Sequence, residues 1–253
     1  MTETSTVDEQ PGIPARSQTD VVIAGIKGMI TDGRLGPGSR LPIERDLATE
    51  LGVSRGSLRE GVRALAILGV LETRQGDGTY VTSLDPERLL SPLGILAELH
   101  TPAHAGHLLA VRRVLEAESA ALAASALTDE DLAALDAILD EVDGILASDP
   151  DMDLERFIDT DTAFHRRIAQ ASGNPALAGM IDSLVGRTHR ARLWRAITER
   201  GTVRETQGEH RAILAELKAH DPERARIRMA VHILGVEEFA TAHAGDEASD
   251  PAP

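Results

Sequence analysis

The stretch ERDLATELGVSRGSLREGVRALAILGVLETRQGDGTYV, residues 44–81, decides the fold of the N-terminal part of the chain. Gly52 separates two helical patterns, and Ser54 is placed to cap the second helix. After Gly69, the runs VLETR and TYVTS predict two short strands joined by a hairpin with a glycine-rich tip at residues 75–78. Two helices joined by a tight turn and followed by such a hairpin are typical of a winged helix-turn-helix.

A further helix is expected before this stretch. Apolar residues recur at helical spacing over residues 20–31, and Gly33 follows as a C-cap. Pro42 is expected in the first turn of the next helix, which runs to Leu51. The sequence therefore predicts a three-helix domain with a β-hairpin wing over residues 20–83.

The chemistry of the third helix suits DNA. A helix that enters the major groove by its N-terminal end can direct arginines to guanine edges or to phosphates. Arg55 and Arg59 lie one turn apart, away from the inward stripe of Leu58, Val62 and Leu65. The residues alone leave open the alternative that both arginines belong to a solvated helix face.

Residues 33–81 resemble the DNA-binding domain of the GntR family of regulators along nearly their whole length. The resemblance implies that Arg45, Arg55 and Arg59 contact the operator and that the wing tip reaches the minor groove. The expected DNA-binding set is Arg45, Ser54, Arg55, Ser57, Arg59, Gly76 and Gly78. The chain departs from the family pattern at Ile43, where many members have a capping Ser, and at Gly61, where Ala is common; we expect both to lower helix stability.

The composition favours two domains and allows a nucleic-acid partner. The chain has 253 residues, 42% of them hydrophobic, and a net charge of −15. Residues 17–83 carry eight Lys and Arg against eight Asp and Glu, whereas residues 84–253 carry 17 against 30. The acidic excess thus lies outside the expected DNA-binding domain. Cysteine is absent, which excludes disulfide frameworks, thiolate metal sites and cysteine nucleophiles. Neither a signal peptide nor a membrane-spanning run is apparent, so we expect a soluble cytoplasmic protein.

The remainder of the chain reads as helical from about residue 84 to 243, which predicts an antiparallel bundle and a mainly α fold overall. We expect a disordered arm (1–19), a linker leading into the first bundle helix (84–94), the helical domain (95–243) and a disordered tail (244–253). The expected helices cover about 88–100, 105–127, 129–147, 152–172, 175–200, 203–219 and 222–243.

Four residues of this second domain have spacing suited to a metal site. His210 precedes Asp221 by eleven residues and His232 follows it by eleven, so a helical hairpin turning there places both at the same height. Asp161 and His165 are four apart and share a helix face. One carboxylate and three imidazoles suit Zn, Mn, Ni or Fe. The alternative is that these are ordinary polar residues on helix flanks.

A second histidine group is less well placed. His100, His104 and His107 are close in sequence, but Pro102 and Gly106 interrupt the helix that would align them. We interpret this group as a solvated connection.

The segments RVLEAESAALAA (113–124), DTDTAFHRRIAQASGNP (159–175) and EHRAILAEL (209–217) resemble the FCD ligand-binding domain of FadR-type GntR regulators. The resemblance implies that Asp161, His165, His210 and His232 bind a divalent metal, that an organic-acid effector binds beside it, and that an arginine in the segment around residues 112–116 supplies its positive partner.

Arg112 is the better of the two adjacent arginines for that role. It lies on the inward seam that we expect from Leu108, Arg112, Leu115, Ser119 and Leu122, whereas Arg113 points away. The alternative is that Arg112 pairs with an acidic neighbour such as Asp161.

The sequence thus predicts a homodimeric DNA-binding regulator, in the role of a repressor, with a small carboxylate effector at a metal centre and Zn as the first choice of metal. One alternative keeps the regulator but makes its effector site metal-free. Another is a metal-dependent enzyme acting on small carboxylates, with Glu209 or Glu116 as general base.

Overall fold

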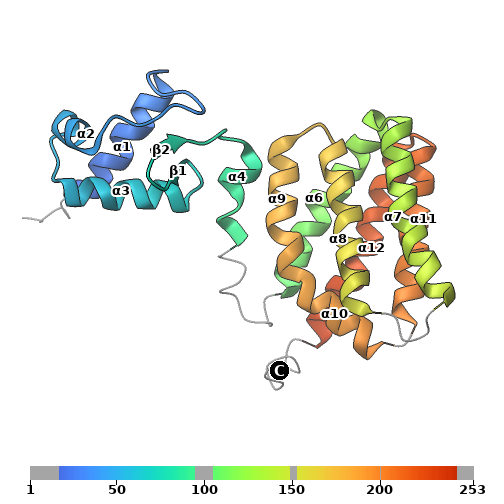
Figure 1. Ribbon diagram of the computed structural model, residues 1–253. Coiled ribbons are helices and arrows are strands. Elements are labelled where there is room, and N and C mark those ends of the chain that lie inside the picture. The colour runs from blue at the N-terminus through green and yellow to red at the C-terminus, as the bar shows by residue number, and fades with distance from the viewer. Residues whose placement is uncertain (1–16, 95–104, 149–152, 200, 244–253) are drawn as a thin grey trace, which may run out of the picture. The chain divides into compact units, whose positions relative to one another are not determined.

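The computed structural model describes residues 17–94, 105–148, 153–199 and 201–243. These residues form two compact units, one ending at Ser83 and the other starting at Leu84 (Figure 1). Residues 1–16 of the expected arm (1–19) and the expected tail (244–253) lie outside the described residues. The last three residues of that arm are ordered, since Ser17 caps α1 and the helix begins at Gln18.

The first unit is the predicted winged helix-turn-helix. Its elements are α1 (Gln18–Thr31), α2 (Glu44–Leu51), α3 (Arg55–Ile67), β1 (Leu71–Arg74) and β2 (Gly78–Val81). The strands pair antiparallel, with Leu71 opposite Val81. α1 begins two residues before the expected start, because Ser17 caps it and forms a capping box with Asp20.

Two details of the first unit bear on the sequence expectations. Pro42 does not lie in the first turn of α2; Ile43 is the N-cap residue, so Pro42 precedes the helix. Ile43 makes no side-chain cap hydrogen bond, as expected. Gly61 sits where α3 crosses α1, and an added Cβ would lie 2.5 Å from Val22 Cγ1. Glycine at this position therefore allows close packing of the two helices.

The second unit is a helical bundle around one large apolar core (Figure 1). Its elements are α4 (Pro86–Leu90), α6 (Ala105–Ala126), α7 (Asp129–Ser148), α8 (Leu154–Ala171), α9 (Pro175–Val185), the 3₁₀ turn η2 (Gly186–Thr188), α10 (His189–Thr198), α11 (Thr202–Lys218) and α12 (Pro222–Ala242). α6 and α12 make the most extensive helix–helix contact of this unit. None of the described helices is long and apolar enough to cross a membrane.

The structure corrects three expectations for the second unit. The helix expected over 175–200 is divided by η2 into α9 and α10. The helix expected over 88–100 is described only as the short α4, and residues 95–104 lie outside the described part. On α6, Arg112 and Ser119 are buried as expected, but Leu122 is 38% exposed. The Ala-rich face of α6 packs into the core instead, and its small side chains allow α12 to approach closely.

Candidate functional site

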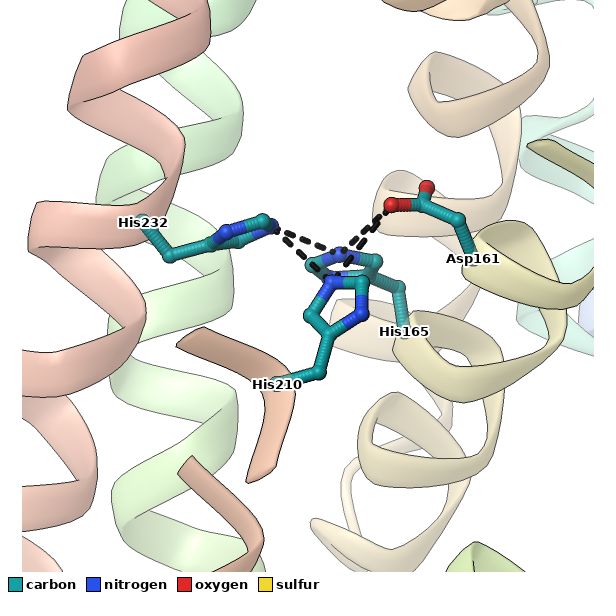
Figure 2. A group of neighbouring side chains, drawn as sticks. All are labelled: Asp161, His165, His210 and His232. Atoms are coloured by element: carbon teal, nitrogen blue, oxygen red, sulfur yellow. Dashed lines mark hydrogen bonds and ion pairs between the residues drawn. The ribbon is translucent and has the colours of Figure 1, made fainter. Parts of the chain in front are cut away.

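Four buried side chains from three helices converge inside the second unit (Figure 2). α8 supplies Asp161 and His165, α11 supplies His210, and α12 supplies His232. The Nε2 atom of His232 lies 3.3 Å from that of His210 and 3.2 Å from that of His165. Asp161 Oδ1 lies 3.4 Å from His210 Nε2 and 4.0 Å from His165 Nε2.

Local structure explains this convergence. Asp161 and His165 are one turn apart on the inner face of α8. α11 ends at Lys218, and Asp221 caps α12 by accepting from the Arg224 backbone N–H at 3.0 Å. This short turn makes α11 and α12 antiparallel neighbours, which brings His210 and His232 to the same height.

The outer nitrogens of two imidazoles face carboxylates. Glu116 Oε2 pairs with His165 Nδ1, and Glu209 Oε2 lies 2.8 Å from His232 Nδ1. The Glu209–His232 contact is a hydrogen bond, whereas the Glu116–His165 contact is a close approach without hydrogen-bond geometry. A carboxylate hydrogen-bonded to Nδ1 keeps the proton there and directs the lone pair of Nε2 toward the centre of the group. Burial and the neighbouring imidazoles lower the pKa of His210 and of His232 well below the usual value, which favours the neutral form that binds metals.

Arg112 lies fully buried beside this group. Its Nε donates to Glu116 Oε1 at 2.6 Å and its Nη1 donates to Thr188 Oγ1 at 2.5 Å. Burial raises the pKa of Glu116, but the charges of Arg112 and His165 outweigh that effect and hold the pKa far below its usual range. Within the described residues, Arg112 Nη2 has no hydrogen-bond partner. The guanidinium thus pairs with Glu116 and keeps a free donor.

Arg192 is a buried site residue that the sequence reasoning missed. Its Nη1 pairs with Asp161 Oδ2, and its Nη2 donates to the Val185 carbonyl oxygen at 2.9 Å. Burial and the charge of Arg112 lower its pKa to about 9, so it stays charged at neutral pH. Arg192 thus holds one oxygen of Asp161 and leaves Oδ1 facing the imidazoles. The alternative for Arg112, an inward arginine paired with an acidic neighbour, is observed with Glu116 as that neighbour, whereas Asp161 pairs with Arg192.

The donor set fits a metal ion. Two nitrogens that bind one Zn²⁺ at about 2.0–2.1 Å in tetrahedral geometry lie about 3.3–3.4 Å apart. The two Nε2 separations from His232, 3.3 and 3.2 Å, are close to this value. One ligand atom from each of the four residues lies within 4.8 Å of all the others. The four residues could therefore hold a divalent cation.

The other histidine group does not form a comparable site in the described structure. His107 lies on the exposed side of α6, while His100 and His104 lie outside the described residues.

The expected DNA-binding residues lie at the surface of the first unit. Ser54 caps α3 by accepting from the Ser57 backbone N–H at 3.0 Å, and the two hydroxyls are 2.9 Å apart. Arg55 is exposed in the first turn of α3. Arg59 forms an exposed ion pair with Glu44 at 2.8 Å, and Arg45 pairs with Asp46 at 2.9 Å. Such exposed pairs are weak and cost little to replace by other contacts.

The wing closes a groove against α2 and α3, lined in part by Arg59, Arg63, Arg74 and residues 75–78. Gly76 and Gly78 have φ of 75° and 149°, which favour glycine. Arg40, which the sequence reasoning did not include, donates from Nη2 to the Asp77 carbonyl oxygen at the wing tip. A Cβ on Gly78 would lie 2.7 Å from Arg40 Nε, a contact that this flexible side chain can relieve, so the positive φ is the stronger reason for glycine there.

Comparison with known proteins identifies both units. Residues 18–81 match the bacterial regulatory proteins of the gntR family, and residues 107–235 match the FCD domain. The chain belongs to the GntR family. It is 32% identical over 220 residues to the HTH-type transcriptional regulator LutR of Bacillus subtilis, an alignment that covers 85% of this chain and 97% of LutR.

Further relatives are also regulators. The chain is 30% identical over 226 residues to the putative L-lactate dehydrogenase operon regulatory protein of Escherichia coli, covering 86% of this chain and 84% of that protein. The solved structure of Streptococcus agalactiae GntR matches with a TM-score of 0.63 and 27% identity, covering 87% of this chain and 99% of that one.

This GntR-family protein is accordingly a DNA-binding transcription regulator with an FCD domain, and not an enzyme. The two carboxylates that we considered as general bases have a different environment. Glu116 faces His165 and Arg112, and Glu209 faces His232, so both are partners of the imidazoles.

Proposed function

We propose that this regulator binds a small organic acid at a metal centre formed by Asp161, His165, His210 and His232, and that the acid controls its affinity for operator DNA. The observation that carries the proposal is the convergence of these four buried ligands beside Arg112, whose Nη2 lacks a partner within the described residues. Zn²⁺ is the first candidate, and Mn²⁺, Ni²⁺ and Fe²⁺ suit the same donors.

The binding of a carboxylate is supported by orphaned polar atoms on one face of α6. Arg112 Nη2 and Ser119 Oγ are both buried without a hydrogen-bond partner, and they flank Glu116, which contacts His165. Four protein ligands fill a tetrahedral shell, so a carboxylate oxygen would bind where the ion expands its coordination, as Zn²⁺ can to five positions and Mn²⁺ can to six. The E. coli relative is named for an L-lactate dehydrogenase operon, so L-lactate is a reasonable first test compound.

For DNA, we propose that α3 enters the major groove with Arg55 and Arg59, that Arg45 binds the backbone, and that Ser54 and Ser57 at the start of α3 contact phosphates. Gly76 and Gly78 let the wing approach the minor groove. The ion pair of Arg59 with Glu44 is exposed, so DNA can replace it at small cost.

A two-fold operator requires two reading heads, and we propose a homodimer formed through the second unit. α6 carries the exposed Val111 and Val114, and α12 carries the exposed Ile227 and Val231, with Val114 64% and Val231 57% exposed. Exposed apolar side chains on two packed helices are the kind of surface that a second copy would cover. We further propose that the protein is a repressor and that effector binding releases it from the operator.

The metal is tested by elemental analysis of the purified full-length protein. We expect stoichiometric metal in the wild type and its loss in the His210→Ala/His232→Ala double variant. His189→Ala is the matched control, because His189 is partly buried on α10 and lies near Glu155 instead of the centre. Wild-type protein without metal would favour the metal-free effector site.

The regulation is tested by selecting operators from random DNA with the full chain and then titrating the selected site with L-lactate in the presence of Zn²⁺. We expect a pseudo-palindromic site whose affinity falls when lactate or another small carboxylate binds. An affinity for the operator that no small carboxylate changes, with or without Zn²⁺, would contradict the proposed coupling.

A further inference from the structure

Glu116 holds two components of the site at once. It is 2% exposed and lies in the middle of α6, with Arg112 one turn before it. Its Oε1 accepts from Arg112 Nε at 2.6 Å, and its Oε2 pairs with His165 Nδ1. The Glu116 carboxylate therefore links the Arg112 guanidinium, whose Nη2 has no partner among the described residues, to the His165 imidazole, whose Nε2 faces the proposed metal centre.

We propose that Glu116 is a positioning residue that couples metal binding at His165 to anion binding at Arg112. This inference rests on the proposed function above. Glu209 also faces an imidazole, but its side chain is 30% exposed and no arginine pairs with it among the described interactions. Glu116 is thus distinguished by its contact with Arg112.

The coupling follows from the acidity of a bound imidazole. A cation on His165 Nε2 draws electron density from the ring and strengthens the Nδ1–H as a donor, so Glu116 is held more firmly on the His165 side. Its hold on Arg112 weakens in return, and the guanidinium is left with more positive charge for an incoming carboxylate. By linkage, an anion on Arg112 must favour metal binding by the same factor.

Glu116→Gln is the direct test. The amide keeps the size of the side chain but presents an NH₂ group to one of two donors, so one of the two contacts is lost. We expect the Zn²⁺ affinity, measured by competition with a chromogenic chelator, to fall about 10–100-fold. The absorption bands of the Co²⁺-loaded protein are expected to shift, which a merely structural effect on the fold would not produce.

Glu118→Gln is the matched control. Glu118 lies two residues further along the same helix, is 51% exposed, and pairs with Arg226 away from the site. It should keep the wild-type Zn²⁺ affinity and Co²⁺ spectrum. If Glu116→Gln also keeps both, the inference is overturned, even where the variant melts at a lower temperature.

Removing the Glu116 charge leaves Arg112 buried without a counter-charge, so a second variant guards against misfolding. Glu116→Gln/Arg112→Met removes both charges and should fold, yet still bind Zn²⁺ weakly. Arg112→Met alone should strengthen Zn²⁺ binding, because Glu116 is then released from the guanidinium and held by His165 alone. In the Glu116→Gln background the Arg112 substitution should no longer have this effect; an equal effect in both backgrounds would contradict the coupling.

Acetate serves as the anion probe. We expect it to raise the Zn²⁺ affinity of the wild type and to raise that of Glu116→Gln by a smaller factor, whereas an equal factor in both proteins would overturn the inference. A wild type that binds no Zn²⁺ at all would overturn the proposed metal centre itself, and the two failures are therefore distinguishable.

Discussion

Gly61 shows how a single residue can combine a local cost with a gain in packing. A glycine inside a helix costs up to about 1 kcal/mol relative to alanine, and this cost was the basis for expecting Gly61 to weaken α3. The structure places Gly61 against Val22 of α1, where a Cβ would lie 2.5 Å from Cγ1 and 2.7 Å from Cβ of that valine. The close approach of α1 and α3 thus depends on the absence of a side chain.

We therefore expect Gly61→Ala to destabilise the first unit by about 1–2 kcal/mol, because overpacking costs more than the helix propensity gains. Urea unfolding measures the change. Gly28→Ala on α1 is the control, since nothing lies within 4 Å of its Cβ and alanine should there stabilise the helix. Adding Val22→Ala to Gly61→Ala should recover part of the clash energy; an unaltered or higher stability of Gly61→Ala alone would contradict the packing argument.

At the scale of elements, the sequence predicts those features that depend on helical periodicity and on residue spacing. Helical repeats and breakers indicate the bundle, and equal distances from Asp221 bring His210 and His232 together. The break of the expected 175–200 helix was not predicted, although residues 186–188 read Gly-Arg-Thr and a glycine inside a helix is unfavourable. Tertiary contacts explain that break: η2 presents Thr188 to Arg112, and α10 presents Arg192 to Asp161. The roles of Glu116 and Glu209 likewise depend on contacts between helices.

Three helices contribute ligands to the proposed metal centre, so metal removal should loosen the second unit. A metal that binds only the folded state adds about 2.7 kcal/mol at a free concentration of 100 Kd. We expect a chelator to lower the unfolding temperature of this unit in calorimetry and leave the transition of the first unit unchanged. His210→Ala should be insensitive to the chelator. An identical shift in both transitions would indicate a general effect of the chelator instead.

At the scale of the whole molecule, charge and apolar surface are divided between the two units. The first unit is nearly neutral, with its arginines at the α3 and wing surface, whereas residues 84–253 carry 30 acidic and 17 basic residues. An acidic sensing unit repels DNA and leaves the reading surface as the attractive part of the chain. Precise reading of two half-sites then depends on how two copies are held together.

We propose that two copies are held together through exposed apolar side chains of α6 and α12. Val114 and Val231 are 64% and 57% exposed, and a glutamate at either position would have to be buried without a partner in a dimer. We expect Val114→Glu/Val231→Glu to convert the proposed dimer to a monomer in sedimentation experiments and to weaken operator binding at least 10-fold. Ile197→Glu on α10, where Ile197 is 58% exposed, adds one glutamate elsewhere and should leave the proposed dimer intact. Because the substituted positions lie outside the first unit, a monomer that still binds the full operator as tightly as the wild type would show that reading does not require this interface.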